Sequence, residues 1–229
     1  MENTQFSQPQ LIKLVASRLL IGIPVLLLIL FLPAGTFAFW EAWVYLAILL
    51  IPMTMVMFYF LKKAPELLAR RMKLKEKEVE QKLIIKLSFI PFTLAFILPG
   101  IDRRFGWSDV PVTLVAVADL LVLIGYTMFF LVLKENQFAS RVIEVEKGQK
   151  VIQSGPYQMV RHPMYLGAIL MYISSPLALG SYWAIIPALF ILPIFIARII
   201  NEESVLTKEL KGYSEYKLKT RYRLIPGIW

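Results

Sequence analysis

The chain has 229 residues, of which 58% are hydrophobic, and it contains one histidine and no cysteine. This content is too apolar for a soluble domain, so we interpret the chain as an all-α integral membrane protein. The missing cysteines exclude disulfides, thiolate nucleophiles and iron–sulfur clusters, and a single histidine leaves no usual zinc ligand set, so no metal is predicted. The formal net charge of +9 indicates basic loops at a lipid surface rather than nucleic-acid binding.

Apolar segments predict about six transmembrane helices, at roughly 15–32, 42–61, 84–99, 111–133, 164–179 and 182–199. Prolines inside or at the ends of these segments predict kinks or helix ends. We divide the chain into N-terminal transmembrane helices, 1–133, and a C-terminal part, 134–229, in which 164–199 forms a helical hairpin.

Almost all lysines and arginines fall in segments that six spans place on one face of the membrane. These segments are the N-terminus, 62–82 together with Lys86 at the start of the third span, 134–161 and the tail from 198. The loop between the third and fourth spans holds the two exceptions, Arg103 and Arg104. Because loops rich in Lys and Arg stay in the cytoplasm, we expect a multi-pass protein of the inner (plasma) membrane with both termini cytoplasmic.

The stretch SGPYQMVRHPMY, residues 154–165, precedes the fifth span and contains the histidine, His162. Its Ser-Gly-Pro-Tyr start is typical of a turn. Pro163 suits the first turn of a helix, which puts His162 at the helix cap. Two interpretations stay open. Backbone N–H groups at this helix start can receive an anion such as a carboxylate, or the stretch is an interfacial cap from which Arg161 reaches lipid phosphates.

The stretch ARIINEESVL, residues 197–206, lies where the sixth span leaves the bilayer. Arg198 and Glu202 are four residues apart and share a helix face, whereas Glu203 points about 100° away. The pair is either a solvated ion pair worth a few tenths of a kcal/mol or part of a site. In the tail, Tyr213 and Tyr216 alternate with basic residues, which is typical of an interfacial segment. No Gly-x-Gly or Walker loop occurs, so soluble-type dinucleotide or ATP binding is not predicted.

The order of these motifs over 134–229 resembles a known family. Gly-x-Tyr, Arg-His-Pro-x-Tyr, a helical hairpin, Arg-x-x-x-Glu-Glu, Gly-Tyr-x-x-Tyr and Tyr-Arg follow one another. This order resembles the isoprenylcysteine carboxyl methyltransferase family, in its prokaryotic branch, and the wider group of small membrane methyltransferases that includes phospholipid methyltransferases. The resemblance implies S-adenosyl-L-methionine as cofactor, in a cytoplasmic pocket closed by the C-terminal segment. It also implies methyl transfer to a membrane-resident or amphipathic acceptor that enters between helices.

Carried over position by position, the resemblance implies two catalytic residues. Arg198 would face the acceptor and Glu202 would contact the cofactor. The remaining implied cofactor-binding residues, the last three of which would complete the lid, are Gln149, Lys150, Val151, Ile152, Tyr157, His162, Pro163, Tyr165, Glu203, Tyr213 and Tyr216.

The motifs leave the acceptor open. A carboxylate (O-methylation) is favoured because it is already anionic at neutral pH, and the Arg198 guanidinium could hold it in a bidentate grip. A lipid amine or small thiol (N- or S-methylation) would have to give up a proton, to His162 or a glutamate. Outside methyl transfer, the chain could be a sterol-reductase-like membrane reductase that uses NADPH, or a non-enzymatic transporter or scaffold, although no inverted repeat is visible.

Overall fold

A computed structural model describes residues 7–72, 79–140, 142–146 and 148–229, without the side chains of 79 and 80. Every regular element within these ranges is a helix, which confirms the all-α prediction. Five helical stretches are long and apolar enough to cross a membrane. They are α1 (Gln8–Ala34), α2 (Trp40–Lys63), α4 (Val79–Phe105), α5 (Val112–Glu135) and the pair α7 (Ile185–Leu189) and α8 (Ile191–Glu209).

The fifth and sixth predicted spans differ from expectation in length and continuity. Helix α6 (Pro163–Ala178) has 16 residues, fewer than the usual span, and begins at Pro163 with His162 as its cap, as predicted. The predicted sixth span is broken at Phe190 into α7 and α8. Pro187 and Pro193 flank this break, and a proline has no N–H to continue the helical hydrogen bonds. Helix α8 then continues past the predicted end to Glu209.

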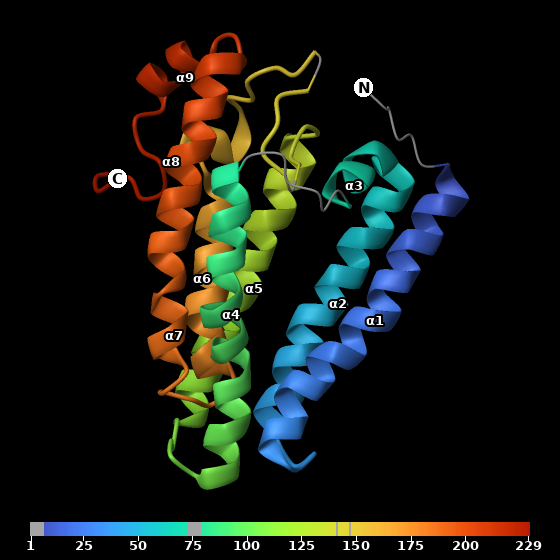
Figure 1. Cartoon of the computed structure of the whole chain (residues 1–229), viewed down its shortest axis with the longest axis vertical. Coiled ribbons are helices and arrows are strands. Elements are labelled where there is room, and N and C mark those ends of the chain that lie inside the picture. The colour runs from blue at the N-terminus through green and yellow to red at the C-terminus, as the bar shows by residue number, and fades with distance from the viewer. Residues whose placement is uncertain (1–6, 73–78, 141, 147) are drawn as a thin grey trace.

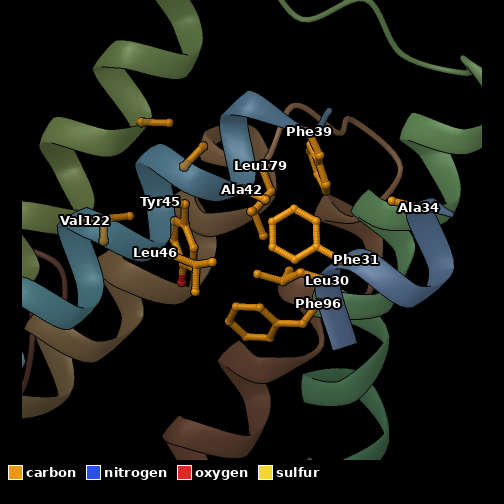
Figure 2. Close-up of a cluster of buried hydrophobic side chains, with 12 residues drawn as sticks. Leu30, Phe31, Ala34, Phe39, Ala42, Tyr45, Leu46, Phe96, Val122 and Leu179 are labelled. Atoms are coloured by element: carbon orange, nitrogen blue, oxygen red, sulfur yellow. The ribbon is translucent and has the colours of Figure 1, made fainter. Parts of the chain in front are cut away.

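Helices α4 to α8 form one bundle, and α1 and α2 run antiparallel along its side, with α1 packed on α4 and α2 packed on α5 (Figure 1). An apolar cluster joins the two parts at the lower end of the molecule (Figure 2). Leu30 and Phe31 of α1 lie there with Phe96 of α4 and Val122 of α5. Within a bilayer such side chains hold helices together mainly by close van der Waals packing, because lipid tails are as apolar as the side chains themselves.

The polar segments gather at the other end of the molecule. The start of α1, α3 (Pro65–Arg71), the described residues of 136–162 and α9 (Tyr213–Lys219) all lie in the upper part of Figure 1. This agrees with the predicted clustering of basic segments on one face. The basic residues within 73–78, with Arg141 and Lys147, were counted in that prediction but lie outside the described residues. Which face of the membrane this end occupies stays a prediction.

Candidate active site

A polar pocket opens at the end of the bundle where the basic segments gather. Its wall is formed by residues from 136–140, 142–144 and 149–152, by the 3₁₀ turn Gly155–Gln158, by the start of α6, by the end of α8 and by α9. It encloses about 880 Å³ of empty space, its open mouth included.

The pocket brings together residues that are far apart in the sequence. Every predicted site residue except Glu203 lines it. These residues are Gln149, Lys150, Val151, Ile152, Tyr157, His162, Pro163, Tyr165, Arg198, Glu202, Tyr213 and Tyr216. Their common placement agrees with the site implied by the motifs, but the function of each residue stays a prediction.

Arg198 and Glu202 share a face of α8, and the hydroxyl of Tyr165 lies between them. This hydroxyl donates to Glu202 Oε2 at 2.6 Å and accepts from Arg198 Nε at 2.8 Å. Tyr165 stands on the first turn of α6, so the three side chains also fix α6 to α8. The arrangement places an anionic and a cationic group side by side in one wall of the pocket.

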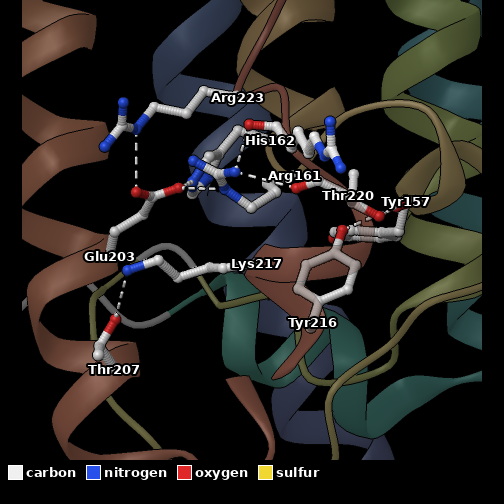
Figure 3. Close-up of polar contacts among 10 residues, drawn as sticks. Tyr157, Arg161, His162, Glu203, Thr207, Tyr216, Lys217, Thr220 and Arg223 are labelled. Atoms are coloured by element: carbon white, nitrogen blue, oxygen red, sulfur yellow. Dashed lines mark hydrogen bonds and ion pairs between the residues drawn. The ribbon is translucent and has the colours of Figure 1, made fainter. Parts of the chain in front are cut away.

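Glu203 points away from the pocket and binds the segment that follows α9. Its side chain is only 5% exposed and accepts from Arg161 Nε at 2.6 Å and from Arg223 Nε at 2.9 Å. His162 Nε2 lies 3.1 Å from the same carboxylate (Figure 3). The side chain of Arg161 also donates to the carbonyls of Thr220 and Arg221, so it is buried and does not reach lipid phosphates. Glu203 therefore connects α8 and the start of α6 to the C-terminal segment.

Besides Tyr165, three tyrosines line the pocket: Tyr157, Tyr213 and Tyr216. Burial raises the pKa of Tyr216 to about 12, and burial raises the pKa of Tyr157 and of Tyr213 well above the usual range. All three hydroxyls are therefore protonated at neutral pH and do not act as bases. Tyr216 donates to the Tyr157 carbonyl at 2.7 Å, and Asn136 donates to the Tyr157 hydroxyl at 2.8 Å.

The hydroxyl of Tyr213 is buried and has no hydrogen-bond partner within the described part of the chain. Because a buried polar group without a partner costs free energy, such a group at a pocket wall is a candidate for binding a ligand.

Two features of the site were not predicted. Asn136 lines the pocket from the end of α5, and Gln81 of α4 contacts Arg198 from outside the pocket lining. No motif marks either residue, because each meets its partner only through helix packing.

A second cavity, an apolar groove, lies between α4 and the α7–α8 pair and encloses about 1260 Å³ of empty space, its open side included. Its wall runs from Trp107 and Trp183 to Ile194. Ile194 and Arg198 are four residues apart on α8, so the groove ends about one helical turn from the polar pocket.

The fold is that of a helical membrane protein, and a polar pocket lies at one end of its bundle. Residues 113–212 match the family model described as phospholipid methyltransferase. The match confirms the resemblance to small membrane methyltransferases and supports a methyltransferase activity. It starts in α5, before the motif region at 134, and ends at Gly212, so Tyr213 and Tyr216 lie beyond it and α4 lies before it.

The chain is also similar to the Delta(14)-sterol reductase TM7SF2 of Mus musculus. The two are 30% identical over 92 residues, which are 38% of this chain and 22% of the reductase. The chain thus matches about a fifth of the length of this curated relative.

Proposed function

We propose that the protein transfers a methyl group from S-adenosyl-L-methionine to the carboxylate of a membrane-resident or amphipathic acceptor. The observation that carries this proposal is the position of Arg198. It lies in a polar pocket whose wall falls largely within the methyltransferase match, and about one turn from an apolar groove. A polar donor and an acceptor with an apolar chain would each find a matching surface there.

The polar pocket fits the chemistry of the donor. Glu202 would attract the positive sulfonium, and the open start of α6 at Pro163 would receive the carboxylate of the amino acid part. The partnerless Tyr213 hydroxyl offers a further hydrogen bond to a polar group of the donor. When bound, the donor supplies a methyl carbon that forms a bond to the acceptor oxygen while its bond to sulfur breaks and sulfur keeps the electron pair.

The chain's own contribution is orientation and exclusion of water. Arg198 would orient the carboxylate through the planar fork of its guanidinium, and no base is needed because this acceptor is already anionic. Helix α9 and the C-terminal segment, tied down by Glu203, would cover the site. The apolar part of the acceptor would lie along the groove between α4 and α8.

The proposal is tested by the chemical stability of the transferred methyl group. Membranes that contain the protein are incubated with methyl-labelled S-adenosyl-L-methionine, and lipid-extractable label is then treated with mild base. We expect base-labile label, because an ester hydrolyses and releases methanol. Base-stable label would instead support an amine or thiol acceptor, with His162 or a glutamate taking the proton. Membranes with Arg198→Gln protein are the control for label from unrelated enzymes.

A second candidate function is an NADPH-dependent membrane reduction. The similarity to a sterol reductase favours it, although this similarity covers about a fifth of that protein. NADPH and S-adenosylhomocysteine, the demethylated donor, differ in charge and size, so ligand-induced stabilisation of the purified protein separates the two functions.

A further inference from the structure

Helix α3 lies outside the segment that matches the methyltransferase family, yet it contacts the wall of the polar pocket. Its apolar side chains, Leu67 and Leu68, are buried in a cluster with residues of α1 and α2. The same cluster includes Leu133 at the end of α5 and Ala139 of the pocket wall. The helix is therefore fixed in place by its neighbours and can support the polar segment that lies against it.

The last two arginines of α3 hold the segment that forms this wall. Arg70 Nε donates to Glu146 Oε2 at 2.7 Å, and Arg70 Nη1 donates to the Gln137 carbonyl at 2.8 Å. Arg71 Nη1 donates to the carbonyl of Ser140, a residue of the pocket wall, at 3.0 Å. Because a planar guanidinium donates in fixed directions, these contacts set the position of the segment relative to α3.

Glu146 connects Arg70 to the part of the wall that follows. The N–H of Glu146 donates to Gln149 Oε1 at 2.9 Å, and the N–H of Gln149 donates to the Glu146 carbonyl at 3.0 Å. Gln149 and the three residues after it line the pocket, and all four belong to the predicted cofactor-binding residues. Arg70 and Glu146 do not line the pocket themselves, so any effect of this ion pair on a ligand must pass through the segment 149–152.

Arg70 contacts two carboxylates whose surroundings differ. Glu66 lies one turn before it on α3, with its Oε2 3.7 Å from Arg70 Nη2 and its side chain 80% exposed. The contact with Glu146 is 1.0 Å shorter, as the difference between 3.7 and 2.7 Å, and the Glu146 side chain is 20% exposed. An exposed ion pair contributes little free energy, whereas a short and shielded pair contributes more. Loss of Glu146, and not of Glu66, should therefore release the pocket segment.

We propose that Arg70 is a positioning residue for the methyl donor, because through Glu146 it holds the segment 149–152 where this segment binds S-adenosyl-L-methionine. This inference rests on the proposed function and extends the donor site to a residue of the N-terminal helices, before the part that matches the family. Without the ion pair, the segment would occupy its binding position only part of the time. The apparent dissociation constant rises in inverse proportion to that fraction.

The test compares Glu146→Gln with Glu66→Gln, the same chemical change at the two carboxylates that contact Arg70. Titration calorimetry of the purified protein gives the dissociation constant of S-adenosylhomocysteine. We expect Glu146→Gln to weaken binding about tenfold, as for a segment in place about a tenth of the time. Glu66→Gln should change the dissociation constant less than about twofold, because an exposed ion pair holds nothing at the pocket.

Trypsin reports the position of the segment independently of affinity, because Lys150 is exposed and lies within it. Cleavage after Lys150 should be faster in Glu146→Gln than in wild type or Glu66→Gln, since local opening exposes the backbone. At saturating S-adenosylhomocysteine the rates should become equal, because the ligand selects the same position of the segment in each protein. A purely structural role of the ion pair would lower the melting temperature without this ligand-reversible difference.

Arg70→Gln removes the same ion pair from the side of α3 and keeps the test decisive if Glu146→Gln does not fold. It should weaken binding at least as much, and adding Glu146→Gln to it should cost less than about threefold more, because both changes remove one interaction. Wild-type affinity in both single variants, or an equal loss in Glu66→Gln, would overturn the inference and leave the methyltransferase proposal standing. A wild-type protein that does not bind S-adenosylhomocysteine would overturn both.

Discussion

Glu202 and Glu203 are neighbours in the sequence and lie in different surroundings. Glu202 lines the pocket and accepts from Tyr165, whereas Glu203 is buried against Arg161 and Arg223. Because successive residues of a helix point about 100° apart, one face of α8 serves the pocket and the next holds the C-terminal segment. Removing the charge of Glu202 should therefore affect ligand binding, whereas removing the charge of Glu203 should affect the stability of the fold.

Glu202→Gln should weaken the binding of S-adenosylhomocysteine by about tenfold, or roughly 1.4 kcal/mol, with an unchanged melting temperature. The reason is that Glu202 is partly buried in the pocket wall, where a ligand can use its charge, and the amide oxygen of glutamine can still accept the hydrogen bond from Tyr165. Titration calorimetry of the purified protein measures the effect. Wild-type affinity in this variant would show that Glu202 is only a solvated residue at the helix exit.

Glu203→Gln should destabilise the protein, on the order of 3 kcal/mol, because it leaves Arg161 buried without its counter-charge. The C-terminal segment should also detach, so trypsin should cut faster after Lys219, Arg221 or Arg223. Time-resolved proteolysis followed by mass spectrometry measures this. The control is Glu215→Gln, the same change at an exposed position of α9. Equal cleavage of the two variants would refute the role assigned to Glu203.

Helices α5 and α6 approach each other through Gly125 and Gly167. A Cβ added to Gly125 would lie 2.6 Å from the carbonyl oxygen of Gly167 and 2.7 Å from Cγ of Met171. Membrane helices use small residues in this way, because packing between backbones replaces the hydrophobic effect. This contact sets the position of α6, which carries Tyr165 and the His162 cap into the site.

We expect Gly125→Ala to destabilise the protein by about 1–3 kcal/mol through overpacking. Gly22→Ala is a matched control, since Gly22 lies in α1 and a Cβ there would meet nothing within 4 Å. The control should be neutral or slightly stabilising, because alanine favours a helix over glycine. Thermal unfolding in one detergent compares the two, and equal melting temperatures would contradict the close contact.

The sequence predicted helices more reliably than it predicted their interruptions. Apolar length alone located the five spanning stretches and the shorter α6, because a span must satisfy its backbone groups within a helix. The break at Phe190 was not predicted, since Pro187 and Pro193 could each have been a kink or an end. The short helices α3 and α9 were also not predicted, because a helix of a few turns leaves no distinct apolar period.

The predicted pocket residues came from motifs that lie close together in the chain. The contacts among these residues could not be predicted from the motifs. Gln81 and Arg198 are separated by 117 residues and meet only because α4 packs on α8. The role of Glu203 could not be predicted either. The sequence does not indicate that this carboxylate points to Arg161 and Arg223 rather than into the pocket.

At the scale of the whole molecule, basic residues gather at the end that holds the pocket, and we expect this end in the cytoplasm. Reporter fusions after Lys82 and after Trp229 should both report a cytoplasmic location. A signal from the opposite side of the membrane at either position would contradict this topology. It would also separate the pocket from a donor made in the cytosol.

The function proposed for the whole molecule depends on which cofactor occupies the polar pocket. The most direct measurement is the melting temperature of the purified protein with S-adenosylhomocysteine and, separately, with NADPH. A ligand at about 100 times its dissociation constant stabilises the folded state by about 2.7 kcal/mol, which shifts the melting temperature measurably. We predict a rise with S-adenosylhomocysteine that is reduced in Glu202→Gln, and no rise with NADPH. A rise with NADPH and none with S-adenosylhomocysteine would contradict the methyltransferase function and favour a reductase.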